Sequence, residues 1–312
     1  AGNTIVVKPS PYTPLTTLAL ARVLRGVLPD GVLNVITGPD PLGAALVSHP
    51  IPRKVSFTGS TAVGKRVAVA AAEDLKRVTL ELGGNDPAII LKDANVEDVA
   101  ARLFWSAFGN NGQICLAVKR VYAHEDVQPA LVEALGELAR KARVDDGMAD
   151  GAQLGPLNNQ PQFERIKGLV SDAVANGARV VSGGHVIDRP GYFYSPTILD
   201  NVNDGFRVVN EEQFGPVLPV MAFRDEAEAI ERANNSEYGL TASVWSADAD
   251  HAAALASEID SGQVSINSHG GGVQKHLPFG GHKWSGIGVE NGPWGLASFT
   301  ELQVISGPSR LK

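Results

Sequence analysis

Short runs of β-branched and other apolar residues alternate with Ala- and Leu-rich stretches, and this alternation most constrains the fold of the chain. Early runs lie at 4–10, 32–38 and 54–60, and stretches of helical composition follow them at 14–28, 42–48 and 61–72. A strand, a helix and a further strand at this spacing predict right-handed parallel βαβ units. The runs are apolar almost throughout, as expected for strands covered on both faces. The sequence therefore predicts an α/β fold with a parallel sheet.

A second series of the same kind follows the sequence "ELGG" at 81–84. Strands are expected at 87–91, 118–124, 178–184, 192–199, 217–223, 240–246 and 263–267, and helices at 96–108, 127–142, 162–176, 226–234 and 250–259. Residues 145–161 are rich in Gly, Asp and Asn and are expected to form a loop. The ELGG turn, where the first series ends, is the predicted boundary between two parts of the chain.

Charge and composition exclude several classes of function. The chain of 312 residues has a formal net charge of −7 and no basic block, so nucleic acid is not an expected partner. No apolar run approaches the roughly 18 residues of a membrane span, and no membrane association is expected. A single cysteine excludes an internal disulfide and a multi-cysteine zinc site, and it fits the reducing cytoplasm, the expected location. The opening "AGNTIVV" has no Met and no leader and enters a strand at once, as expected of a fragment.

The stretch "GSTAVGKR" at 59–66 is close to a phosphate-binding P-loop but departs from it at one decisive position. A P-loop requires Ser or Thr after its lysine, because that hydroxyl coordinates Mg²⁺, and the residue after Lys65 is Arg66. What remains is a glycine turn leading into a helix, whose free N–H groups and positive dipole end attract an anion. Ser60 can also serve simply as the N-cap of that helix, and this alternative stays open.

The single cysteine, Cys115, lies in the unusual segment "FGNNGQICLAV" at 108–118. A lone cysteine is most often a small apolar core residue. Here, however, Gly and Asn residues precede it, and such residues break helices and expose backbone groups. The segment therefore predicts a thiol displayed on a loop, as a nucleophile requires, with a buried structural cysteine as the alternative.

Glu81 is the second candidate for chemistry. It ends the apolar run "RVTLE" and precedes Leu82 and two glycines. Partial burial there raises the pKa of a carboxyl toward the range of a general base, and a carboxylate that pairs or caps at a strand end is the alternative. None of the seven histidines sits in a catalytic or metal-binding signature, so no metal site is predicted.

Five motifs occur in one order along the chain: "FTGSTAVG", "LELGG", "GQIC", "EEQFGPV" and "LPFGGHKWSGIG". In this order and at these spacings they resemble the aldehyde dehydrogenase superfamily, and the similarity covers essentially the whole chain. The resemblance implies an α/β fold in which a parallel, Rossmann-like nucleotide-binding part precedes an α/β catalytic domain. It assigns the C-terminal portion of the nucleotide-binding part to 1–83, the catalytic domain to 84–295, and a tail completing the catalytic and oligomerisation region to 296–312. It also implies a homodimer or homotetramer for the full-length parent.

Two residues match the catalytic positions of that family. Cys115 matches the cysteine of GQxC, which attacks an aldehyde to give a thiohemiacetal and, after hydride transfer to the nicotinamide, a thioester; its own N–H supplies one oxyanion donor. Glu81 matches the ELGG glutamate that activates the hydrolytic water, a residue that the coenzyme-A-acylating members generally lack. The resemblance thus implies oxidation of a small-molecule aldehyde to a free carboxylic acid.

The cofactor positions of the family also transfer residue by residue. On the adenosine side, Lys8 matches the lysine at the ribose and Gly38 matches a glycine beside the adenine. Gly59 and Ser60 match the helix start at the pyrophosphate. On the nicotinamide side, Gly83 matches a position near the ring, Glu212 matches the glutamate at the ribose, and Phe214 matches a residue packed beside that glutamate. Phe279 is expected to line the substrate funnel, with core packing as the alternative. Pro11 replaces an acid that many NAD-preferring relatives carry, so the cofactor is NAD or NADP, with Lys8 and Ser10 near a 2′-phosphate.

Two departures and two competing functions accompany this resemblance. Asn85 replaces the common lysine after ELGG. The resemblance also implies that an N-terminal region, which carries the asparagine completing the oxyanion hole, is absent, so the chain alone is expected to be poorly active. A non-catalytic nucleotide-binding protein of the same fold is the alternative function. A thioesterase or acyltransferase that uses Cys115 is the other, and it needs no cofactor.

Overall fold

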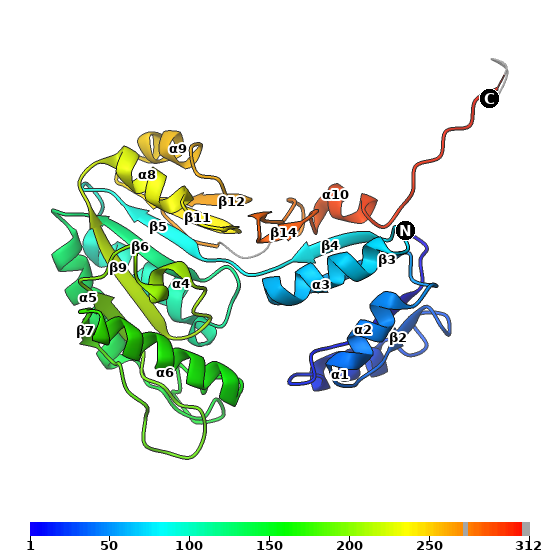
Figure 1. Cartoon of the computed structure of the whole chain (residues 1–312), viewed down its shortest axis with the longest axis horizontal. Coiled ribbons are helices and arrows are strands. Elements are labelled where there is room, and N and C mark those ends of the chain that lie inside the picture. The colour runs from blue at the N-terminus through cyan, green and yellow to red at the C-terminus, as the bar shows by residue number, and fades with distance from the viewer. Residues whose placement is uncertain (271–273, 308–312) are drawn as a thin grey trace.

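The computed structural model describes residues 1–270 and 274–307. Its largest element is a seven-stranded sheet, seen at the left of Figure 1, with the strand order β12-β11-β5-β6-β9-β8-β7. The strands are β5 (Asp86–Ile90), β6 (Val118–His124), β7 (Arg179–Ser182), β8 (Thr197–Asp200), β9 (Val217–Phe223), β11 (Thr241–Trp245) and β12 (Gln263–Ile266). Neighbouring strands are parallel except at the edge, where β7 pairs antiparallel with β8. The predicted α/β fold with a parallel sheet is therefore confirmed.

Helices cover both faces of this sheet, because its strands alternate their side chains between two apolar cores. Around β5, Ala88 and Ile90 belong to one buried cluster, whereas Ile89 and Leu91 belong to the other. The first cluster includes α4 (Val96–Phe108) and α5 (Gln128–Lys141); the second includes α6 (Gln160–Ala175), α7 (Arg207–Asn210), α8 (Glu226–Asn234) and α9 (Ala249–Ala256). The loops at the strand ends therefore extend from a sheet that is packed on both sides.

A second sheet of three strands has the order β14-β4-β3. β3 (Lys54–Thr58), α3 (Thr61–Ala72) and β4 (Arg77–Glu81) form a parallel βαβ unit as predicted, and β14 (Gly286–Ile287) pairs with β4 in the antiparallel direction. The buried apolar core of this sheet is small and consists of Val67, Leu80 and Leu82. Beyond β4 the chain runs directly into β5, so residues 82–85 connect the small sheet to the large one (Figure 1).

The N-terminal segment is loosely packed against the rest. β1 (Ile5–Val7) and β2 (Leu33–Val35) form a parallel pair of their own, accompanied by α1 (Leu15–Val23) and α2 (Asp40–Ser48). α2 contacts α3, but no residue in 1–63 is buried. The remaining elements are short: η1 (Gly109–Gly112), β10 (Tyr238–Gly239), β13 (His282–Lys283) and α10 (Gly292–Ala297).

Several expected elements have the bounds that the sequence predicts, among them 61–72, 96–108, 118–124, 217–223 and 226–234. The helix expected to reach residue 28 ends at Val23, because Gly26 adopts a φ of 81° and the chain turns there. The division at 83/84 and 295/296 stays a prediction; β14 adds a segment from the predicted catalytic domain to the small sheet. No helix in residues 1–270 and 274–307 combines the length and the apolar composition that a membrane span requires.

Candidate active site

Cys115 is displayed on a tight turn between α4 and β6. The 3₁₀ turn η1 follows α4 directly, and Asn110, Asn111 and Gly112 have positive φ values of 51°, 57° and 68°. Asn and Gly adopt this backbone conformation most readily. At residue 112 only glycine fits, since a Cβ would lie 2.4 Å from the carbonyl oxygen of Gly215. The turn explains the Gly and Asn residues before Cys115, and Cys115 itself is half-buried.

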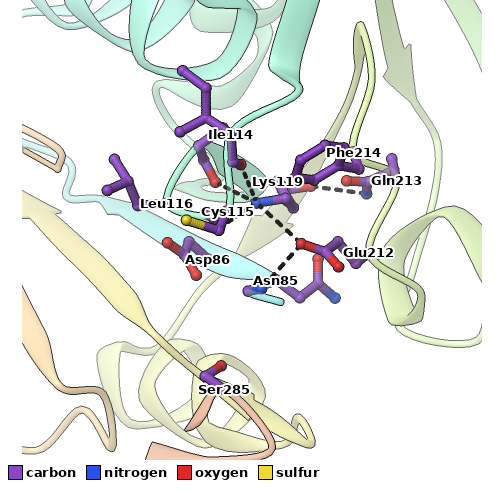
Figure 2. A network of polar contacts seen from close by, with 12 residues as sticks. Asn85, Asp86, Ile114, Cys115, Leu116, Lys119, Glu212, Gln213, Phe214 and Ser285 are labelled. Carbon is purple, nitrogen blue, oxygen red and sulfur yellow. Dashed lines mark hydrogen bonds and ion pairs between the residues drawn. The ribbon is translucent and has the colours of Figure 1, made fainter. Parts of the chain in front are cut away.

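The ammonium of Lys119 lies against the backbone of this turn (Figure 2). Its Nζ donates to the carbonyl oxygens of Ile114, Cys115 and Ala117 at 3.0, 2.6 and 3.2 Å. The Lys119 side chain is only 3% exposed. The turn that carries the thiol is therefore held by a buried cation from the neighbouring strand β6.

Burial raises the pKa of the Cys115 thiol above its ordinary value, because the buried thiolate is poorly solvated. The Lys119 ammonium acts in the opposite direction, whereas the Asp86 carboxylate adds to the effect of burial. A hydrogen bond from the Leu116 N–H favours the thiolate, and the charge of Glu212 disfavours it. Ionisation of the thiol thus depends on one cation, two carboxylates and one backbone donor.

Glu81 ends β4 and is buried, with 3% of its surface exposed. Neither of its carboxyl oxygens has a hydrogen-bond partner among the described residues. Burial, and after it the nearby charge of Glu290, raises the pKa of Glu81 to about 8. A carboxyl group with this pKa lies in the range of a general base that works near neutral pH.

The segment Gly83–Gly84 brings the turn of Cys115 close to the strand of Glu81. A Cβ on Gly84 would lie 2.5 Å from the carbonyl oxygen of Cys115, so this close approach requires glycine. Gly84 is three residues beyond Glu81, and three residues span at most about 11 Å even when fully extended. The backbones of both catalytic candidates therefore lie in one region, and the prediction that their side chains face one reaction cavity stays a prediction.

Glu212 contacts the same segment (Figure 2). Its Oε1 accepts a hydrogen bond from the Gly84 N–H at 3.0 Å and lies 3.9 Å from Nζ of Lys119. A Cβ on Gly83 would lie 2.5 Å from its Oε2. Burial raises the pKa of Glu212, and the charge of Lys119 partly opposes that rise. Gly83 and Glu212, which the sequence singled out separately as cofactor residues, are thus in direct contact.

The two aromatic candidates have well-defined backbone contacts. Phe214 has a positive φ of 52°, and its carbonyl accepts from Nε2 of Gln162 at 2.8 Å. Phe279 is buried, and its backbone exchanges two hydrogen bonds with Glu290, at 2.8 and 2.7 Å. Phe279 is therefore hydrogen-bonded to Glu290, whose charge raises the pKa of Glu81. The roles of Phe214 at the ribose and of Phe279 in a substrate funnel stay predictions.

The candidates at the start of α3 have partners within the protein. The hydroxyl oxygen of Ser60 accepts from the Val63 N–H at 3.4 Å, which confirms the N-cap interpretation. The N–H of Gly59 donates to the carbonyl of Glu81 at 3.1 Å, so it is not available to a phosphate. An anion at this helix start would therefore meet the hydroxyl and the amides that follow Gly59, and this role of Ser60 stays a prediction.

The other three cofactor candidates lie on the N-terminal segment, apart from the Cys115 turn. Nζ of Lys8 donates to the carbonyl of Pro9 at 3.1 Å, and the hydroxyl of Ser10 accepts from the Tyr12 N–H at 3.2 Å. At Gly38 a Cβ would lie 2.7 Å from the side chain of residue 42. These contacts are local, and the expected contacts with an adenosine moiety stay predictions.

Sequence reasoning missed three polar side chains packed behind the Cys115 turn, those of Asp86, Lys119 and His269. Asp86 is buried on β5 and accepts a hydrogen bond from the hydroxyl of Thr241. Nε2 of His269 lies 3.1 Å from the carbonyl oxygen of Leu116, and Lys119 lies on β6 as described above. The signal that could have found two of them is a charged residue inside a strand covered on both faces, because such a charge has to be paired.

A family model described as the aldehyde dehydrogenase family matches residues 1–305 of the chain. The chain belongs to the aldehyde dehydrogenase family. It is 42% identical to retinaldehyde dehydrogenase 3 of Rattus norvegicus over 308 residues, and this alignment covers 98% of this chain and 60% of that protein. It is 40% identical to betaine aldehyde dehydrogenase of Brucella anthropi over 310 residues, and this alignment covers 97% of this chain and 63% of that protein.

Two solved structures show the fold of this chain. An NAD⁺ complex of aldehyde dehydrogenase from Bacillus cereus matches with a TM-score of 0.93 and 41% identity, over 96% of this chain and 61% of that chain. An NADP-dependent enzyme of E. coli matches with a TM-score of 0.92 and 38% identity, over 96% and 62%. The chain thus spans about 60% of the length of its curated relatives, and over this length it has the aldehyde dehydrogenase fold.

Proposed function

We propose that this chain carries the reactive centre of an aldehyde dehydrogenase that oxidises an aldehyde to a carboxylic acid with NAD⁺ or NADP⁺. The observation that carries the proposal is a half-buried thiol on a turn that contacts Gly84, three residues from a buried carboxyl, Glu81, with a pKa of about 8. A nucleophile and a base of this kind are what acyl transfer through a thioester requires. Membership of the aldehyde dehydrogenase family supports the class of reaction.

The residues around this centre fit a nicotinamide dinucleotide. At Gly83 the backbone approaches the Glu212 carboxylate so closely that a Cβ would lie 2.5 Å from its Oε2, and this carboxylate would accept hydrogen bonds from the hydroxyls of the nicotinamide ribose. The first turn of α3, after Ser60, offers amide N–H groups and the positive end of the helix dipole to a pyrophosphate. Lys8 would hold the adenosine ribose. Because position 11 is a proline, no carboxylate there would repel the 2′-phosphate of NADP⁺. When bound, the nicotinamide accepts the hydride that the aldehyde carbon loses.

Cys115 forms the covalent bond to the substrate in this proposal. Its thiolate adds to the carbonyl carbon, and the carbonyl oxygen becomes the alkoxide of a thiohemiacetal. The N–H of Cys115 donates to no oxygen or nitrogen within the described ranges, so it is free to stabilise that alkoxide. When the carbon loses its hydride, the C=O bond re-forms and the acyl group is left on the sulfur as a thioester.

Glu81 then activates water for hydrolysis of the thioester. The carboxylate takes a proton from water, the hydroxide adds to the thioester carbon, and the C–S bond breaks to release the acid and return the thiolate. The carboxyl group acts only when it is ionised, and its pKa of about 8 leaves much of it protonated at neutral pH. Hydrolysis is therefore expected to limit turnover at neutral pH and to accelerate as the pH rises through about 8.

Two substitutions test this assignment, with NAD⁺ and NADP⁺ and a panel of aliphatic and aromatic aldehydes that includes retinaldehyde and betaine aldehyde. Cys115→Ala is expected to lower turnover by roughly 10³-fold or more. Glu81→Gln is expected to form one equivalent of reduced cofactor rapidly and then to stop, because only hydrolysis needs the carboxylate. Normal rates in Cys115→Ala would contradict the proposal. Calorimetric binding of NAD⁺ with no oxidation of any aldehyde by the full-length parent would favour the non-catalytic alternative.

A further inference from the structure

Lys119 is a buried cation for which the reaction described above has no use. A buried ammonium is costly unless it is paired or hydrogen-bonded. Its carboxylate neighbour, Glu212, is 3.9 Å away, whereas three backbone carbonyls lie within 2.6–3.2 Å of Nζ. The strongest contacts of this charge are therefore with the backbone of the Cys115 turn, and not with its counter-ion (Figure 2).

The direction of those carbonyls determines the direction of the amides that follow them. In a trans peptide the C=O and the next N–H point in opposite directions, and no cis peptide occurs among the described residues. The carbonyls of Ile114 and Cys115 point at Nζ of Lys119, so the N–H groups of Cys115 and Leu116 point away from it. The Leu116 N–H lowers the pKa of the Cys115 thiol, so it lies on the side of the sulfur. Lys119 thus directs two consecutive N–H donors toward the side of the turn where the thiol lies.

The next carbonyl of the turn is held by a second buried group. Nε1 of Trp245, which can only donate, bonds to the hydroxyl oxygen of Ser243 at 2.9 Å. The Ser243 hydroxyl can then donate to Nδ1 of His269, 2.8 Å away. A carbonyl oxygen can only accept, so the contact of Nε2 with the carbonyl of Leu116 at 3.1 Å places a ring hydrogen on Nε2, which the hydroxyl oxygen of Thr241 also approaches, at 3.2 Å. The orientation that Lys119 imposes therefore continues along the turn.

We propose that Lys119 is a positioning residue that turns the N–H groups of Cys115 and Leu116 toward the thiol and toward the oxygen of the bound aldehyde. The inference rests on the proposed role of Cys115 as the nucleophile. The charged groups that face the sulfur are Lys119 from β6, Asp86 from β5 and Glu212 from the loop before β9, and the ring of His269 lies behind the next carbonyl. Without Lys119 the thiolate would have two carboxylates nearby and no neighbouring cation. The carbonyls of Ile114 and Cys115 would lose the ammonium that holds their direction.

Alkylation by iodoacetamide tests this inference, because Cys115 is the single cysteine of the chain. The rate is measured across the pH range for the intact chain and for Lys119→Met, which keeps the length of the side chain but removes the charge and the donors. We expect the pH midpoint of alkylation to rise by about one unit, which makes the reaction about tenfold slower below the midpoint. In the aldehyde assay we expect kcat to fall by roughly 10²-fold with little change in KM, as for loss of an oxyanion donor.

Lys76 provides a matched control elsewhere in the fold. Its buried Nζ also donates to two backbone carbonyls, those of Val47 and His49, at 2.5 and 2.6 Å. Lys76→Met therefore loses backbone contacts of the same kind, together with an ion pair to Asp74 at 3.2 Å, and its alkylation profile is expected to equal that of the intact chain. Circular dichroism verifies that each variant is folded, and Lys119→Gln, which also lacks the charge, takes the place of Lys119→Met if the latter does not fold.

Two results would overturn the role of Lys119: an unchanged alkylation profile in the folded Lys119 variant, or an equal displacement in Lys76→Met. Failure of the proposed function gives a different pattern. In that case the full-length parent oxidises no aldehyde, while the alkylation profile of the chain still shifts when Lys119 is replaced, and the positioning of the Cys115 turn stands.

Discussion

The two regions that hold the candidate site differ sharply in how they are packed. The Cys115 turn follows α4, which has six buried residues, and leads into β6 in the middle of the seven-stranded sheet. In contrast, α1 and α2 have no buried residue, and nothing in 1–63 is buried. Because burial of apolar surface is the dominant stabilising term, the reactive turn is held by a packed core. The predicted adenosine-binding residues depend instead on local turns and caps.

The largest expected effect is on stability, and it tests this contrast directly. Phe104 on α4 is 1% exposed and packs against Phe108 with ring centroids 4.7 Å apart. Phe104→Ala leaves a cavity in the core and is expected to lower the free energy of unfolding by about 3–5 kcal/mol. Leu20 on α1 is 55% exposed, and Leu20→Ala is expected to change the free energy of unfolding by no more than about 0.5 kcal/mol.

Urea unfolding of both variants measures these changes. A loss at Leu20 as large as that at Phe104 would show that α1 is packed in solution as firmly as α4, and the contrast between the two regions would disappear. Equal slopes of the unfolding curves are the control that both variants unfold from the same native state.

The next effect concerns Glu81, which lies between the two regions. It ends β4, which pairs with β3 of the segment 1–63, and it lies three residues before Gly84, which contacts the Cys115 turn. Its folded pKa of about 8 is far above the value of 4.5 for an ordinary Glu. A raised folded pKa means that the stability due to the bound proton is fully present below about pH 4.5 and is lost as the pH rises through about 8. Glu81→Gln cannot ionise, so its free energy of unfolding is expected to exceed that of the intact chain above pH 8 and to approach it in acid.

Urea unfolding at a series of pH values gives the comparison, with Glu133→Gln as the control. The Glu133 side chain is 65% exposed on α5, and its replacement is expected to have no such pH-dependent effect. If Glu81→Gln and the intact chain lose stability in parallel as the solution becomes alkaline, the buried carboxyl is ionised without cost and its proposed role as a tuned base is wrong.

The sequence predicted the elements of both regions better than the contacts between them. The helices 61–72 and 96–108 are predictable because Ser60 and Asn95 cap them and their apolar residues recur at a local period. Glu81 is predictable as a buried acid because it continues an apolar run. Lys119 was not predicted to act on the turn, because its role depends on where the carbonyls of the turn point. β14 was missed because two residues carry no period, and its partner β4 is distant in the sequence.

The smallest expected effect compares the caps of one helix from each region. Ser60 accepts from the N–H of Val63 at 3.4 Å, and Asn95 accepts from that of Asp98 at 3.1 Å. Loss of a cap costs about 0.5–2 kcal/mol, and the longer bond of Ser60 predicts the lower end for Ser60→Ala and a loss of about 1 kcal/mol for Asn95→Ala. If the start of α3 binds a pyrophosphate, Ser60→Ala also weakens NAD⁺ binding, whereas Asn95→Ala does not. Calorimetry that finds equal NAD⁺ affinities in the two variants would remove the start of α3 from the cofactor site, because only a ligand at that helix end distinguishes the two caps.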